Sequence, residues 1–180
     1  MLVISGPSAS GKTEVAKLLQ EKYGIKKIIT TTTREMRTGE VNGVDYFFIS
    51  KEEFENKIKN GDFVEYMSYN GNMYGSTKDQ LGTKKVIVTD LNGLESYLSL
   101  KCKGIVTFFM LTNEDIRYKR MLERGDGKKN ANKRIKEDKV AFKEESIKDV
   151  NFFISNENKT LEEVTEEVYN KYISYLKLEK

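Results

Sequence analysis

The segment of residues 6–13 constrains this chain more than any other feature, because it fits the pattern G-x-x-x-x-G-K-[ST]. An apolar strand precedes it and an amphipathic helix follows it, which is the setting this phosphate-binding loop requires. Backbone amides of such a loop surround phosphates, the lysine reaches the terminal phosphates, and the hydroxyl ligates Mg²⁺. We therefore expect ATP or GTP with Mg²⁺ as ligand. The loop residues are Gly6, Pro7, Ser8, Ala9, Ser10, Gly11, Lys12 and Thr13.

The composition excludes several classes of catalyst. The 180 residues include no histidine and only one cysteine, Cys102. Ser-His-Asp and Cys-His catalysis, zinc sites with histidine ligands, cysteine metal cages and internal disulfides are therefore ruled out. The chemistry must come from carboxylates, lysine, arginine, hydroxyls, backbone amides or a bound ion.

The length predicts a single domain, and charge and hydropathy indicate a cytoplasmic protein. No signal peptide follows the first apolar residues, and no stretch approaches the ~20 apolar residues of a membrane span. The net charge is +3, with acidic and basic residues intermixed. Because no basic stripe stands out, we expect neither nucleic acid nor membrane as a partner.

Hydrophobic periodicity alternates between strands and helices, which predicts an α/β fold with a mainly parallel sheet. Predicted strands cover residues 2–5, 25–33, 86–89, 105–111 and 151–155. Predicted helices cover residues 14–23, 51–59, 113–125, 132–147 and 160–176, and residues 125–132 are expected to form a mobile loop. Residues 31–78, before the strand predicted at residues 86–89, are rich in turns and aromatic side chains. They include a capping box at Ser50 and Glu53 and a hairpin around Asn70-Gly71, and we expect them to form an inserted subdomain.

Arginine is rare in this chain and is confined to two short regions. Lysine supplies the general surface charge, so arginine is expected where a planar fork must hold a phosphate or a carboxylate. Chance clustering is the competing interpretation. The six arginines are Arg34, Arg37, Arg117, Arg120, Arg124 and Arg134.

The first arginine region contains a long motif that resembles the guanylate kinase family. Residues 30–48 read TTTTREMRTGEVNGVDYFF, which fits T-T-R-x-x-R-x-G-E-x-x-G-x-D-Y. With the phosphate loop before it and GNMYGST at residues 71–77 after it, the resemblance covers nearly the whole chain in order.

The resemblance implies a three-layer P-loop NTPase sandwich with an inserted, mixed GMP-binding subdomain and a helical lid. The core would comprise residues 1–30, 79–122 and 148–180, the insertion about 31–78 and the lid about 123–147. The implied reaction is ATP + GMP = ADP + GDP, with Mg²⁺, in purine nucleotide metabolism. The protein would be a monomer or a homodimer.

The resemblance also implies a set of GMP-binding residues. Guanine presents N1–H and a 2-amino group side by side, so one carboxylate can accept both hydrogens, whereas adenine would leave that carboxylate unpaired. Taken without the resemblance, Glu65 would be an exposed strand carboxylate, and for Tyr46 and Tyr74 core packing is the competing interpretation. The family matches are Arg34, Arg37, Tyr46 and Tyr74 for the phosphate, Glu65, Ser76 and Thr30 for the guanine, and Asp90 beside them.

The second arginine region matches the family's lid. Arg120, Arg124 and Arg134 would close over the ATP phosphates, and Arg37, Arg124 and Arg134 would act with Lys12 on the transferred group. For Arg117 we expect a solvated helix face. Asp90 matches an acid near Mg²⁺, although helix capping is an alternative, and Asn156 would lie beside adenine.

Several departures from the family pattern affect the loop and the lid more than the substrate. The chain has Ala9 where glycine is usual, Glu14 and Thr30 where hydroxyl residues and serine are usual, and Val88 in place of the first acid of an Asp-x-Asp pair. The lid reads RGDG at residues 124–127 instead of R-G-T-E and is about one residue short. Two alternatives stay open: a catalytically weak module that binds phosphopeptides, and a kinase for another small phosphorylated substrate.

Overall fold

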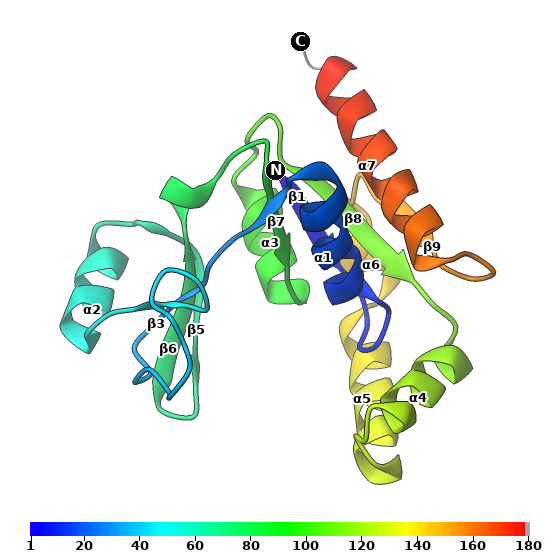
Figure 1. The fold of residues 1–180 in the computed structure, drawn as a ribbon, viewed down its shortest axis with the longest axis horizontal. Coiled ribbons are helices and arrows are strands. Elements are labelled where there is room, and N and C mark those ends of the chain that lie inside the picture. The colour runs from blue at the N-terminus through cyan, green and yellow to red at the C-terminus, as the bar shows by residue number, and fades with distance from the viewer. Residues whose placement is uncertain (179–180) are drawn as a thin grey trace.

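The computed structural model describes residues 1–178, apart from the side chains of Glu144 and Ser146. A five-stranded sheet in the order β2-β7-β1-β8-β9 forms its centre, and all four strand pairings are parallel (Figure 1). The strands are β1 (Leu2–Ser5), β2 (Lys26–Lys27), β7 (Lys85–Val88), β8 (Val106–Leu111) and β9 (Phe152–Ser155). The predicted α/β class with a mainly parallel sheet is confirmed.

Helices cover both faces of this sheet, because both faces of its central strands are apolar. On β1, Leu2 and Ile4 pack on one side against α1 (Lys12–Tyr23) and α7 (Leu161–Leu178). Val3 packs on the other side against α3 (Leu91–Ser99). Residues of β1 thus alternate between two cores, as the two-residue period of a strand requires. The predictions did not include α3, which begins with Asn92 and Gly93 in its first turn, two weak helix formers.

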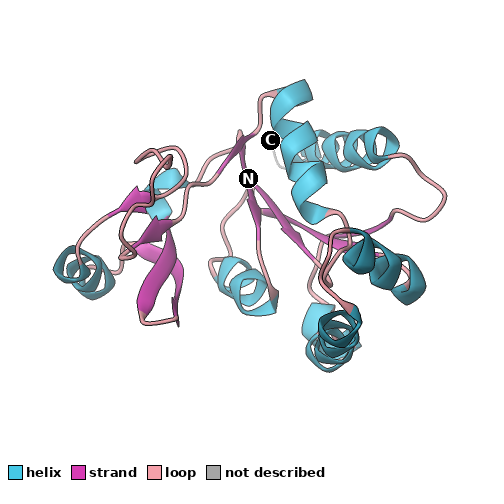
Figure 2. Cartoon of the chain, turned by 60° about the horizontal axis from the view of Figure 1, so that its bottom comes forward, coloured by secondary structure: helices cyan, strands magenta, loops and turns pink. Residues whose placement is uncertain are grey.

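A second sheet of four strands lies beside the first, in the order β4-β3-β6-β5 (Figures 1 and 2). Its strands are β3 (Thr31–Thr32), β4 (Phe47–Phe48), β5 (Phe63–Tyr69) and β6 (Asn72–Thr77). The predicted hairpin is present, with Asn70 and Gly71 at φ 48° and 78°, as a two-residue turn between twisted strands needs. The predicted capping box also forms, because Ser50 Oγ accepts from Glu53 N at the start of α2 (Lys51–Lys59).

The single strand predicted for residues 25–33 is wrong. The chain leaves the parallel sheet after β2 and joins the other sheet at β3. Between the two strands, the side-chain amide of Gln80 accepts from Ile29 N at 2.9 Å and donates to Ile29 O at 2.7 Å. Gln80 lies in the 3₁₀ turn η1 (Lys78–Gln80). A side chain distant in sequence therefore satisfies the backbone that a neighbouring strand would otherwise pair.

The loop and helix predicted for residues 125–147 are partly wrong. After α4 (Glu114–Glu123), helix α5 (Lys128–Ala141) begins within the expected loop, and a short α6 (Glu144–Ile147) follows separately. Only Gly125 and Gly127 need the left-handed backbone, with φ 90° and 73°. Ala131, buried against Met121, draws the first turn of α5 into a small apolar cluster. Among the residues described, no helix is both long and apolar enough to cross a membrane.

Candidate active site

The phosphate loop connects the end of β1 to the start of α1. Gly6 has φ 140°, and a Cβ there would lie 2.8 Å from the carbonyl oxygen of Met110, so only glycine fits. Ala9 has φ 60°, a conformation that costs a residue other than glycine about 1–2 kcal/mol. The glycine that the family usually has at this position would avoid that cost.

Lys12 is folded back onto its own loop. Its Nζ donates to Gly6 O and to Pro7 O, both at 2.7 Å. Burial lowers the pKa of Lys12 to about 8, and the nearby carboxylate of Asp138 partly opposes that shift. The ammonium group is therefore held beside the loop amides, where a phosphate would restore the charged partner it lacks.

On the other side of the loop, Asn156 and Arg120 contact the loop backbone. Asn156 Nδ2 donates to Ser10 O at 2.8 Å, and Arg120 Nη1 donates to Ala9 O at 3.3 Å. Both side chains line a cavity of about 250 Å³ with Gly11 and Leu161. The structure thus places both predicted ATP contacts at the loop, next to a partly apolar cavity.

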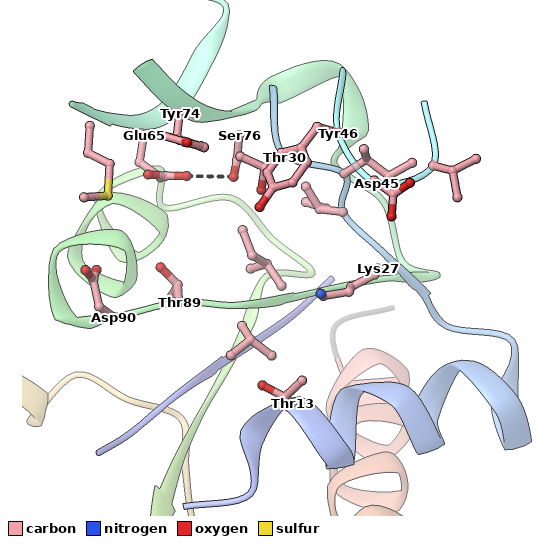
Figure 3. Close-up of a pocket in the computed structure, with 17 residues that line it drawn as sticks. Thr13, Lys27, Thr30, Asp45, Tyr46, Glu65, Tyr74, Ser76, Thr89 and Asp90 are labelled. Atoms are coloured by element: carbon pink, nitrogen blue, oxygen red, sulfur yellow. Dashed lines mark hydrogen bonds between the residues drawn. The ribbon is translucent and has the colours of Figure 1, made fainter. Parts of the chain in front are cut away.

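A cavity of about 440 Å³ lies between the two sheets and brings together residues that are far apart in sequence (Figure 3). Thr13 projects from the start of α1 on one side, and Glu65 and Ser76 face it from the second sheet. Predicted residues that line this cavity are Thr13, Thr30, Tyr46, Glu65, Tyr74, Ser76 and Asp90. Lys27, which the sequence analysis did not single out, also lines it, and nothing in its local pattern distinguishes it from the many surface lysines.

Glu65 and Ser76 form a pair on adjacent strands. They are register partners on β5 and β6, and Ser76 Oγ donates to Glu65 Oε1 at 2.7 Å. Burial raises the pKa of Glu65 above its usual value, while the bond from Ser76 opposes that rise. Glu65 is therefore not the exposed strand carboxylate of the alternative interpretation. In this structure Ser76 donates its only hydroxyl hydrogen to Glu65. Thr30 supplies a second hydroxyl to the same cavity.

Arg34 lies among aromatic rings at the edge of the cavity. Its guanidinium carbon is 5.3 Å from the centroid of the Tyr46 ring, and Nη2 is 2.6 Å from Glu40 Oε1. Tyr46 and Tyr74 pack edge to face at 6.1 Å, and both are partly exposed, so they are not core residues. Arg37 is exposed, and its backbone N–H donates to Glu40 Oε2 at 2.8 Å.

Asp90 follows β7 and caps α3. Its Oδ1 accepts from Gly93 N at 3.0 Å, so the capping alternative is confirmed, yet the side chain also faces the cavity that Thr13 lines. A hydroxyl and a carboxylate are the oxygen ligands that Mg²⁺ takes, and this ion usually keeps several waters. Among the described residues, no group of three acidic, histidine or cysteine side chains could hold a metal. The donor set fits Mg²⁺ held with water and substrate oxygens.

The predicted lid arginines occupy different environments. Arg124, at the end of α4, pairs with Asp126, with Nε 3.0 Å from Oδ1. Arg134 is exposed on α5. The structure therefore brings Arg120 to the loop, whereas Arg124 and Arg134 lie on the helical segments around Gly125 and Gly127.

The solvated position expected for Arg117 is wrong. Arg117 is only 4% exposed, and its Nη1 lies 2.7 Å from Asp138 Oδ2. The sequence analysis missed Asp138 altogether. Periodicity held a signal for both: Arg117 is one turn before the buried Met121, and Asp138 is one turn after the buried Ile135.

Comparisons with known proteins agree with this geometry. The guanylate kinase family model matches residues 1–174. A guanylate kinase of Fusobacterium nucleatum is 41% identical over 127 residues, which are 67% of this chain and 69% of that protein. A guanylate kinase of Wolbachia pipientis wMel is 31% identical over 98% of this chain and 92% of its own length.

A solved structure gives the same result for the fold. The crystal structure of guanylate kinase from Anaplasma phagocytophilum matches with a TM-score of 0.62 and 26% identity, over 97% of this chain and 84% of that one. The family model and the whole-length relative together identify the chain: it belongs to the guanylate kinase family.

Proposed function

We propose that this protein transfers the γ-phosphoryl group of ATP to GMP, which gives ADP and GDP. The observation that carries the proposal is the cavity shared by Glu65, Ser76 and Thr13. It combines a half-buried carboxylate suited to guanine with the edge of a phosphate loop, so one nucleotide in the cavity and one on the loop would meet there.

Guanine would be selected by its hydrogens. Glu65 would accept from N1–H and the 2-amino group, and the hydroxyls of Ser76 and Thr30 would donate to O6. Adenine has no hydrogen at N1, so it would leave a half-buried carboxylate unpaired, and such a mismatch can reduce catalytic efficiency by about 10⁴-fold. When GMP binds, the Ser76 hydroxyl would turn away from Glu65 and donate its single hydrogen to guanine O6.

The GMP phosphate would be held at the outer end of the cavity. Arg34, Tyr46 and Tyr74 already lie together there, and Arg37 is three residues from Arg34 on the same exposed segment. Arg34 would exchange Glu40 for the phosphate, since both present oxygens to the same planar fork.

ATP would lie on the loop, with its phosphates on the backbone amides of residues 6–13, and its adenine near Asn156. Lys12 would leave the carbonyls of Gly6 and Pro7 for the terminal phosphates. Arg37, Arg124 and Arg134 would stabilise the charge of the transferring group, which is the main catalytic demand of phosphoryl transfer. Closure of the insertion, about residues 31–78, and the lid, about 123–147, would exclude water.

Mg²⁺ bound by Thr13 and, through water, by Asp90 would neutralise the phosphate charge during transfer. The protein would act on these small nucleotides in the cytoplasm, as a monomer or a homodimer.

The test is a coupled assay for ADP release with ATP and each of GMP, AMP, CMP and UMP. We expect turnover with GMP, one GDP formed per ADP, and no comparable turnover with the others. Turnover of AMP in preference to GMP would contradict guanine recognition, and binding of GMP without ADP release would indicate a binding module.

Glu65→Gln identifies the base-reading residue within the same assay. The amide cannot accept both guanine hydrogens, so KM for GMP should rise strongly while KM for ATP stays nearly constant. Glu55→Gln, an exposed carboxylate on α2, is the matched control and should change neither value. An unchanged KM for GMP in Glu65→Gln would remove this residue from the site.

A further inference from the structure

We propose that Arg117 and Asp138 are positioning residues of the phosphoryl transfer: they clamp α5 to the phosphate loop and thereby aim Arg134 at the transferred phosphate. This inference rests on the proposed kinase function. It concerns a buried ion pair that the sequence motifs do not include.

The clamp joins three parts of the chain through one carboxylate. Asp138 Oδ2, on α5, accepts from the backbone N–H of Ser8 at 2.9 Å and from Arg117 Nη1, on α4, at 2.7 Å. Arg117 Nη1 also lies 3.5 Å from Ser8 O. Asp138 on α5 therefore holds the backbone N–H of Ser8, and Arg117 on α4 holds its carbonyl oxygen.

Burial makes this contact permanent. The side chains of Arg117 and Asp138 are 5% and 13% exposed. In the described part of the chain, Arg117 Nε has no hydrogen-bond partner, so Asp138 is the anion that compensates a nearly buried cation. Removal of one partner from such a pair costs far more than the pair itself contributes. ATP is therefore expected to bind without opening the clamp.

The geometry of α5 links the direction of Arg134 to the position of Asp138. Residues four apart in an α-helix lie on the same face, one turn apart, so Arg134 lies one turn before Asp138. Because Asp138 rests against the phosphate loop, this face of α5 is directed toward the loop. Ala131 and Ile135, packed against Met121, fix the neighbouring strip of the helix. The exposed Arg134 therefore lies on a helix whose rotation about its axis is fixed by the contact between Asp138 and Ser8.

The clamp also limits which part of the lid can close. Asp138 fixes the second half of α5, whereas Gly125 and Gly127, both with positive φ, lie at the other end. Closure would then be confined to the backbone around Gly125 and Gly127, next to Arg124, while α5 keeps Arg134 in place.

The test removes the pair without leaving a buried charge. In Arg117→Met/Asp138→Val, two apolar side chains with a total volume close to that of the pair replace it, an exchange that is often neutral for stability. We expect a melting temperature within a few degrees of the unmodified protein, an unchanged KM for GMP and a kcat reduced about 10-fold or more. The matched control is Glu114→Gln/Lys139→Gln, which removes the exposed α4–α5 ion pair of 2.8 Å and should leave kcat unchanged.

A double-mutant cycle with Arg134→Ala separates positioning from a merely structural role. Arg134→Ala alone should lower kcat by about 10³-fold, as loss of an arginine on the transferred group does. If the clamp acts through Arg134, adding Arg134→Ala to the double replacement should cost much less than that. Fully additive losses, or an unchanged kcat in the double replacement, would overturn the inference.

A fallback variant and the activity of the unmodified protein distinguish failure of the clamp from failure of the proposed function. If the double replacement does not fold, Arg117→Met/Asp138→Asn, which also leaves no buried charge and keeps the volume of Asp138, replaces it in the same cycle. If the unmodified protein forms no GDP, the proposed function fails. If it forms GDP and the clamp variants keep its kcat, only the clamp fails.

Discussion

Two arginine–carboxylate pairs in this molecule have nearly the same length and are both largely buried, but they have different neighbours. Arg34 and Glu40 are 2.6 Å apart beside the cavity between the two sheets, and Arg117 and Asp138 are 2.7 Å apart against the phosphate loop. Arg34 lies against the rings of Tyr46 and Phe48 at the edge of the second sheet. Arg117 lies between two helices and the loop backbone.

The difference shows that contact distance does not reveal what an ion pair does. Glu40 also accepts from Arg37 N, so its carboxylate would keep a partner if Arg34 turned to a substrate phosphate as proposed. Asp138 has no such freedom, because its release would leave Arg117 uncompensated in the interior. The Arg34–Glu40 pair is suited to break and re-form on each catalytic cycle. The Arg117–Asp138 pair is suited to stay intact.

The largest expected effect is on folding stability. Arg117→Leu alone should lower the free energy of unfolding by about 3–5 kcal/mol, because it leaves the Asp138 carboxylate buried without its cation. For a chain of this length that loss corresponds to roughly 10 °C in melting temperature. Thermal unfolding followed by circular dichroism measures it. If Arg117→Leu had the same melting temperature as Arg34→Ala, the two ion pairs would not differ in their contribution to stability.

A smaller effect is expected on substrate binding. Arg34→Ala should raise KM for GMP about 10- to 100-fold, because a charged bidentate contact to phosphate is lost, with a smaller fall in melting temperature than Arg117→Leu and little change in KM for ATP. Steady-state kinetics with each nucleotide varied in turn measure this split. Lys59→Ala, an exposed lysine at the end of α2, is the control and should leave KM for GMP unchanged. An unaltered KM in Arg34→Ala would mean that Arg34 is structural, like Arg117.

The same contrast explains what the sequence predicted and what it did not. The phosphate loop, the capping box at Ser50 and the turn at Asn70-Gly71 depend on residues within one short segment, so local rules predicted them. The partner of Arg117 is 21 positions away on another helix, and the backbone of Ile29 is satisfied by Gln80, 51 positions away. Side chains that meet only through the fold leave little trace in local patterns.

The roles of the site residues depend on the same distinction. Glu65 could be selected because the family resemblance runs in order along the chain and reaches it, and the structure adds that it is half-buried and accepts a hydrogen bond from Ser76. No motif covers Asp138, and helical periodicity indicates only its side of α5, so its role is inferred from its contacts with Ser8 and Arg117.

The most direct test of the central claim is the hydrogen-exchange rate of the arginine Nε–H groups, measured by NMR without ligand, with ATP and with GMP. The chain has only six arginines, so single replacements can assign every signal. We predict that Arg117 exchanges slowly in all three states, and that Arg34 exchanges faster without ligand and slows with GMP. Exchange of Arg117 that accelerates when ATP binds would show that the clamp opens, and would contradict the account.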